Sequence, residues 1–192
     1  MRIPAIAAAA LATVVACGGS PPQAPRSTQT AASATALPSL TPKPLTASAE
    51  LKDKDGNTVA TAALMEQAGG VRIVLAATRL PAGQHGWHIH AIGKCAPPDF
   101  TTAGGHFNPE GKQHGAQNPQ GAHAGDVGNL AVGADGAARA DVLAKVTLAP
   151  GVASLLKTDG TAIVIHANVD DEKTDPAGNS GARIACGVVT PS

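Results

Sequence analysis

The sequence predicts an all-β domain, a sandwich or barrel, that begins near residue 46. Short apolar stretches, several of them alternating with polar residues, are separated by turn residues throughout this region. No long amphipathic helix is predicted between them. The only aromatic residues are Trp87, Phe100 and Phe107. The core must therefore come mostly from Ala, Val, Leu and Ile, which favours short strands over a large helical bundle.

Turn signals divide this region into short segments. The stretches KDGN (54–57) and ADGA (134–137) contain Asp-Gly, the strongest short hairpin signal. Residues 94–127, rich in Gly, Pro, Asn and Gln, and residues 169–182, rich in Asp and Gly, do not fit strands. So long a loop inside a compact domain needs a function or an ordering ion. The predicted strands are residues 49–53, 58–65, 71–78, 86–92, 129–134, 138–144, 162–168 and 183–189.

Residues 1–16 are typical of a secretory signal peptide. Arg2 precedes an apolar run that is too short to span a bilayer as a stable helix. The ending VVAC resembles the lipobox of bacterial lipoproteins, in which the cysteine becomes the lipidated first residue of the mature protein. This resemblance predicts acyl chains on Cys17 and stable anchoring to a membrane, with plain secretion as the alternative.

Residues 17–45 are dominated by Pro, Ser, Thr and Ala and cannot bury a core. We interpret them as a disordered tether with an average span of about 30 Å. It would hold the domain of residues 46–192 at the extracytoplasmic or periplasmic face of the cell envelope; an arm that lies on the domain is the alternative. The formal net charge of zero gives no basic surface for nucleic acid.

Two cysteines remain if Cys17 is lipidated. Cys95 and Cys186 form an even pair in an exported, oxidising context. A bridge between them would contribute about 4 kcal/mol by loop-closure entropy. Buried free thiols are the alternative.

None of the histidines lies in the signal peptide, the tether or the first three predicted strands. In a strand, residues two apart point to the same face, so His88 and His90 can be two ligands of one metal while Trp87 points into the apolar interior. His166 ends a second apolar strand and can supply a third ligand. Two surface histidines on an exposed strand face are the alternative. The histidines are His85, His88, His90, His106, His114, His123 and His166.

The long loop carries His106, His114, His123 and Asp126 with the spacing H-x7-H-x8-H-x2-D. Three imidazoles and one carboxylate make a closed set of four ligands that suits tetrahedral zinc. Metal binding would supply the folding energy that the backbone of such a loop lacks. Loop histidines without a metal are the alternative, but they leave the length of the loop unexplained.

The segments HGWHIH, GGHFNP, HAGD and GARIACG together resemble copper–zinc superoxide dismutase in its exported bacterial lipoprotein form. The resemblance covers most of residues 46–192. It implies a flattened eight-stranded Greek-key barrel and the conversion of superoxide to O₂ and hydrogen peroxide by Cu²⁺/Cu⁺ cycling. It implies copper ligands His88, His90, His106 and His166, and zinc ligands His106, His114, His123 and Asp126.

The resemblance also implies roles around the two metals. His106 would bridge them, release copper in its reduced state and carry a proton. Asp170 would accept hydrogen bonds from ligand imidazoles of both sites, and Arg183 would dock the anionic substrate. His85 would be structural. Cys95 and Cys186 match the disulfide of the family.

The sequence departs from the family pattern in two places, and two functions other than superoxide dismutation are alternatives. The segment between His166 and Arg183, 16 residues of mostly acidic charge, is shorter than in many eukaryotic members, so efficient steering of superoxide is not assumed. Trp87 stands where a smaller aromatic residue is common.

One alternative function is a membrane-tethered copper or zinc buffer without turnover, which has no use for Arg183. Another is a silent interaction domain, which predicts lost ligands, whereas none is lost. The sequence leaves a monomer and a homodimer both open.

Overall fold

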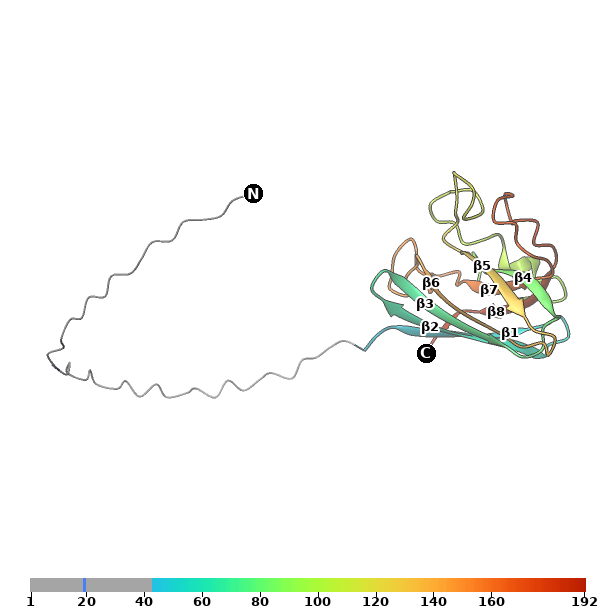
Figure 1. Ribbon diagram of the computed structural model, residues 1–192, viewed down its shortest axis with the longest axis horizontal. Coiled ribbons are helices and arrows are strands. Elements are labelled where there is room, and N and C mark those ends of the chain that lie inside the picture. The colour runs from blue at the N-terminus through green and yellow to red at the C-terminus, as the bar shows by residue number, and fades with distance from the viewer. Residues whose placement is uncertain (1–18, 20–42) are drawn as a thin grey trace, which may run out of the picture. The chain divides into compact units, whose positions relative to one another are not determined.

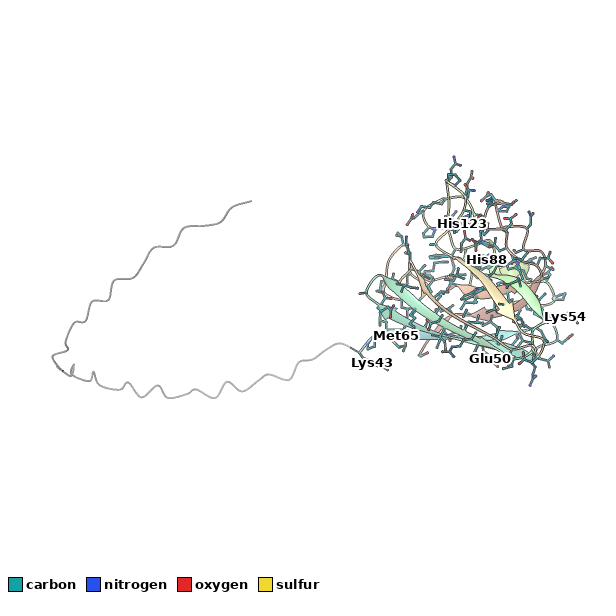
Figure 2. All side chains as sticks on the ribbon, in the orientation of Figure 1. Lys43, Glu50, Lys54, Met65, His88 and His123 are labelled. Atoms are coloured by element: carbon teal, nitrogen blue, oxygen red, sulfur yellow. A yellow bond between two sulfur atoms is a disulfide. The ribbon has the colours of Figure 1, made fainter. Side chains whose placement is uncertain are left out.

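The described part of the chain folds as an antiparallel sheet that nearly closes into a barrel (Figure 1). The structure is a computed structural model, and it describes Gly19 and residues 43–192. The signal peptide, nearly all of the tether and Cys17 lie outside the described residues. Within those residues no helix is long and apolar enough to cross a membrane. The predicted all-β barrel is confirmed.

The strands pair in the order β5-β4-β7-β8-β1-β2-β3-β6, with the short β9 beside β1, and β5 approaches β6 across the gap. The predicted strands all form, with ends shifted by one to three residues at most positions. The bounds are β1 (Thr46–Lys52), β2 (Thr58–Gln67), β3 (Gly70–Ala77), β4 (Gly83–His90), β5 (Asp126–Val132), β6 (Ala138–Ala144), β7 (Ala162–His166), β8 (Arg183–Val188) and β9 (Thr190–Pro191).

The two Asp-Gly turns differ in whether the strands on either side of them pair with each other. The first closes the β1–β2 hairpin: the Asp53 carboxylate accepts hydrogen bonds from the backbone N–H groups of Asp55 and Asn57, and Gly56 adopts a φ of 85° that glycine takes without strain. The second turn also forms, around Gly136. However, it does not make a two-stranded hairpin, because β5 pairs with β4 and β6 pairs with β3.

The core lies inside the barrel, where alternate strand residues from both sides meet. Its largest members include Leu51, Ile73, Trp87 and Ile163, each with no exposed surface. Both faces of β4 are buried from His85 onward, as are both faces of β7. Trp87 and Ile89 join the main core as predicted. The opposite face of β4 is therefore covered by something other than the barrel interior.

Two loops supply that cover. The long loop (residues 91–125, with a 3-10 helix η1 at Thr101–Ala103) and the acidic loop (residues 167–182) both rise above β4, β5 and β7 in Figure 1. Backbone and side-chain hydrogen bonds join them, including Gln117 N–H to the Glu172 carbonyl at 3.0 Å. Both loops therefore close over the outer face of β4.

Candidate metal centre

Four histidines meet on the covered face of β4. His88 and His90 come from β4, His166 from the end of the neighbouring β7, and His106 from the long loop. Each offers a ring nitrogen, and these nitrogens lie within 4.8 Å of one another. The Nε2 atoms of His90 and His166 are 3.4 Å apart. The structure therefore brings together the four residues that the sequence predicts as copper ligands.

In three of these rings, the second nitrogen contacts an oxygen atom that fixes the orientation of the ring. His88 Nε2 contacts Asp170 Oδ2 at 2.7 Å, His90 Nδ1 contacts the Gly104 carbonyl at 2.9 Å, and His166 Nδ1 contacts the Gly181 carbonyl at 3.2 Å. Such contacts set the tautomer and the orientation of a ligand ring. Each of these three rings is thus left with one nitrogen free for a metal.

Two ring nitrogens of this group have no partner. His88 Nδ1 and His106 Nε2 are buried and make no hydrogen bond within the described residues. A buried polar atom without a partner destabilises a fold by about 1–3 kcal/mol, and native proteins seldom leave one unexplained. Imidazole nitrogens are good ligands for copper and zinc. The residues present therefore fit a metal ion at this position.

A second group surrounds Asp126, the first residue of β5. Its Oδ1 atom lies 2.8 Å from His106 Nδ1, 3.0 Å from His114 Nδ1 and 3.3 Å from His123 Nδ1. Its Oδ2 atom accepts hydrogen bonds from the backbone N–H groups of Gly115 and His123, both at 2.9 Å. The carboxylate is thus held by the long loop, which carries all three of these histidines. Three imidazoles and one carboxylate converge, a donor set that suits zinc.

A ring nitrogen of His88 also lies within 4.8 Å of the ligand atoms of His106, His114 and Asp126. The Nε2 atom of His88, however, is occupied by Asp170. His123 Nδ1 lies 3.3 Å from Asp126 Oδ1 and 3.5 Å from His106 Nδ1. A ring nitrogen of His123 therefore also lies beside this group.

His106 and Asp170 link the two groups. The His106 ring has Nδ1 in the second group, and its Nε2 is one of the two unpartnered nitrogens. Asp170 contacts His88 through Oδ2 and His114 through Oδ1, at 2.7 and 3.0 Å. Asn129 at β5 holds Asp170 in turn, by accepting a hydrogen bond from its backbone N–H. One imidazole and one carboxylate therefore connect the two candidate metal positions.

Arg183, the first residue of β8, is positioned by two carbonyl groups. Its guanidinium donates to Phe100 O and to Gly104 O, both at 2.6 Å. Gly104 O also contacts His90, so one carbonyl orients both the arginine and a histidine of the first group. Arg183 borders a surface depression of about 410 Å³. A small anion that enters there meets a fixed positive charge.

Sequence reasoning did not foresee the carbonyl groups that hold Arg183. Gly104 has a φ of 73°, which favours glycine, and a Cβ atom there would lie 3.1 Å from the Ile92 side chain. The pair of glycines just before His106 was the available sequence signal for these carbonyl contacts. Its meaning depends on Arg183, which lies 79 residues away. No local pattern could connect the two.

Three histidines of the first group, His90, His106 and His166, are neutral at pH 7. Burial, reinforced by neighbouring histidines, lowers the pKa of His90 to about 2, of His166 to about 3 and of His106 to about 4. Burial also opposes the charged form of His114, but hydrogen bonds to Asp126 and Asp170 outweigh it and raise the pKa of His114 to about 9. The same contacts hold the pKa of both carboxylates well below its usual range, against the effect of burial.

We expect the metal-free domain to be most stable near pH 6.5. Below the unfolded value of 6.5, the unfolded chain protonates His90, His106 and His166 while the folded chain does not. Unfolding then becomes easier by up to about 1.4 kcal/mol per pH unit for each histidine. As the pH rises from 6.5 to the folded pKa of about 9, the folded chain still protonates His114 while the unfolded chain does not, so the stabilising contribution of protonated His114 is progressively lost. Urea unfolding of the metal-free protein from pH 4.5 to 9.5 measures this, and a flat profile would contradict it.

Two carboxylates of the acidic loop accept hydrogen bonds from groups of the protein itself. Asp171 accepts hydrogen bonds from the backbone of Lys173 and Thr174 and from the side chains of Thr174 and Asn179. Asp170 is bound to the histidines described above. These carboxylates therefore stabilise the loop and the site, as predicted for Asp170 but not for Asp171.

The remaining predicted residues are also placed. His85 lies outside both groups, and its ring contacts the carbonyls of His166 and Pro81 at 2.8 and 2.9 Å. It joins the strand that carries His166 to the start of β4, a structural position. Cys95 and Cys186 form a disulfide, so this prediction is confirmed. The bridge lies between the segment with the Phe100 carbonyl and the strand with Arg183.

Comparisons with known proteins agree with this geometry. The family model for copper/zinc superoxide dismutase matches residues 57–189. A copper–zinc superoxide dismutase of Aquifex aeolicus is 50% identical over 148 residues, which cover 76% of this chain and 86% of the relative. One of Caulobacter vibrioides is 41% identical over 147 residues, covering 74% and 84%. The crystal structure of a superoxide dismutase-like protein from Bacillus subtilis superposes with a TM-score of 0.72 at 41% identity, covering 74% of this chain and 97% of that one.

Proposed function

Because this chain belongs to the copper/zinc superoxide dismutase family, we propose that its two side-chain groups hold one copper and one zinc ion and that superoxide reacts on the copper side. The proposed copper ligands are His88, His90, His106 and His166. The proposed zinc ligands are His106, His114, His123 and Asp126. The observation that carries this proposal is the pair of buried, unpartnered nitrogens, His88 Nδ1 and His106 Nε2.

When bound, copper supplies the one-electron chemistry by which one superoxide becomes O₂ and a second, with two protons, becomes hydrogen peroxide. Arg183 binds and orients the anion, and its two carbonyl contacts hold the guanidinium still. The low pKa of His106 keeps its ring neutral at neutral pH, and the contact of Nδ1 with Asp126 leaves Nε2 as the nitrogen without a proton. With Nδ1 held by zinc, Nε2 would be the atom of this ring that takes a proton whenever it is not a copper ligand.

The test measures metal content and superoxide consumption on one sample. We expect one copper and one zinc per chain, with rapid turnover. Full occupancy of both metals without turnover would favour a metal buffer or delivery protein instead. Less than one zinc per chain in an active protein would contradict the assignment of the second group.

Replacing Arg183 by alanine is expected to lower kcat/KM for superoxide by about 10- to 100-fold, because the fixed charge that attracts and orients the anion is lost. Copper and zinc content should not change, since Arg183 is in neither ligand set. The matched control is Arg139→Ala, which removes the same charge from an exposed position on β6. Pulse radiolysis at low and high ionic strength measures both variants. Equal kcat/KM for the two would remove Arg183 from the mechanism.

We also propose that Cys17 is lipidated and that the domain works in the cell envelope, tethered to a membrane. The support is the lipobox-like VVAC sequence and the Cys95–Cys186 disulfide, a bond that persists in oxidising, exported compartments. Mass spectrometry of the mature N-terminus, with Cys17→Ser as the control, checks this. An unmodified N-terminus downstream of Cys17 would indicate plain secretion.

A further inference from the structure

Each imidazole of the zinc group has a second ring nitrogen that needs a partner. A zinc-bound histidine almost always donates its other N–H to a carboxylate, a carbonyl or water, and that contact fixes the ring. For His114 the partner is Asp170, 3.0 Å from Nε2. For His106 the second nitrogen faces the copper group. The corresponding atom of His123 makes no hydrogen bond within the described residues that would already explain its orientation.

The nearest acidic group to that atom is Asp175 of the acidic loop. Asp175 Oδ1 lies 3.8 Å from His123 Nε2, within the range of a charge contact and slightly beyond a hydrogen bond. The same Oδ1 atom accepts a hydrogen bond from the backbone N–H of His114 at 2.6 Å. One carboxylate oxygen therefore faces the ring of one zinc histidine and binds the backbone of another.

The surroundings favour a defined position for this carboxylate. The His123 side chain is 7% exposed and the Asp175 side chain 47% exposed, so the pair lies at the edge of the buried group. Two further hydrogen bonds join the two loops: Gln117 N–H donates to Glu172 O, and Asn118 Nδ2 donates to Lys173 O. The acidic loop thus meets the zinc half of the site over several residues: Asp170 contacts His114, and Asp175 is the carboxylate of this loop that lies within 4 Å of His123.

We propose that Asp175 is a positioning residue for zinc: its carboxylate orients His123 with Nδ1 toward the metal and fixes the main chain at His114. The inference rests on the proposed function, because it requires zinc at His114, His123 and Asp126. It gives the acidic loop a second carboxylate with a role like that of Asp170. Asp170 connects zinc to copper, whereas Asp175 serves zinc alone.

The test compares zinc affinity in Asp175→Asn and Asp175→Ala, by competition with a chromophoric chelator. Asparagine keeps an oxygen for the His114 N–H and loses the charge near His123. We expect Asp175→Asn to bind zinc about tenfold more weakly, the lower end of the effect of such outer partners, and Asp175→Ala to bind it more weakly still. Copper affinity should stay within twofold of wild type. The control for the charge change is Asp159→Asn, a carboxylate with 79% side-chain exposure outside both loops.

A spectroscopic measurement separates positioning from a general loss of structure. In ¹⁵N-labelled protein loaded with zinc but not copper, the His123 Nε2–H proton should exchange slowly in wild type and faster in Asp175→Asn, while the His114 Nε2–H proton does not change. Unchanged zinc affinity and unchanged His123 exchange in Asp175→Asn would overturn the inference.

Asp126→Ala distinguishes this outcome from failure of the zinc assignment itself. If Asp126→Ala loses zinc and Asp175→Asn does not, only the role of Asp175 is wrong. If Asp126→Ala binds zinc as tightly as wild type, the zinc site assigned above is wrong, and the role of Asp175 falls with it.

Discussion

Replacing His166 by alanine is expected to abolish superoxide turnover and to leave zinc bound. The ring of His166 ends β7 and contributes Nε2 to the first group, 3.4 Å from His90 Nε2. It makes no contact with Asp126, so the zinc group loses nothing. Loss of an outer partner of a metal ligand lowers affinity or activity by 10- to 100-fold, so loss of a direct ligand should exceed about 100-fold. Metal analysis and pulse radiolysis on one preparation measure both effects.

His85→Ala is the matched control for this variant. His85 is buried, as His166 is, and it contacts the His166 carbonyl, but it belongs to neither group. We expect this control to lower the unfolding temperature while keeping one copper per chain. If both variants retain copper and turnover equally, the copper assignment fails. If both lose copper equally, then folding rather than ligation explains the His166 result.

Removing the disulfide is expected to produce the largest loss of stability. Cys95 and Cys186 are 91 residues apart in the chain. On the loop-closure model, the double variant Cys95→Ser/Cys186→Ser should lose about 4–5 kcal/mol of unfolding free energy. For a domain of this size that corresponds to a fall in Tm of roughly 10–20 °C. Calorimetry of the metal-free proteins measures this without the stabilisation that bound metals add.

The same variant should also lose activity when it is fully metal-loaded and folded. The bridge joins β8, which begins at Arg183, to the segment whose Phe100 carbonyl holds that arginine. Without the bridge, the guanidinium can leave its position beside the copper group, so kcat/KM should fall while metal content is unchanged. A Tm within about 3 °C of wild type, which on this scale is near 1 kcal/mol, would show that the bridge constrains little.

Much of the fold follows from local patterns, because burial on one face of a strand imposes a period of two on the sequence. Strands such as β3 and β6 could therefore be located to within a residue or two. The turn at residues 134–137 shows the limit of this reasoning. Asp-Gly specifies a tight turn, but whether β5 and β6 then pair depends on which neighbours the barrel gives each strand.

For the candidate site too, some features could be predicted from the sequence and others could not. The residue types and spacings of the histidines, with the family resemblance, were enough to name both ligand sets and Arg183 from the sequence. The donor atoms were not. That Asp126 meets three rings with one oxygen, and that His88 presents Nδ1 while His90 presents Nε2, depends on contacts to Asp170 and Gly104.

The sequence by itself thus determined the class of the fold, the ligand types and the pairing partners available to two cysteines. These properties depend on residue identity and on neighbours close in the chain. The family resemblance already named Asp170, but the tertiary structure alone decided the other contacts that orient the site: Asp175 reaches His114, 61 residues away, and one Gly104 carbonyl holds both His90 and Arg183. Hydrogen bonds act over about 3 Å, so such contacts exist only after the barrel has brought its two loops together.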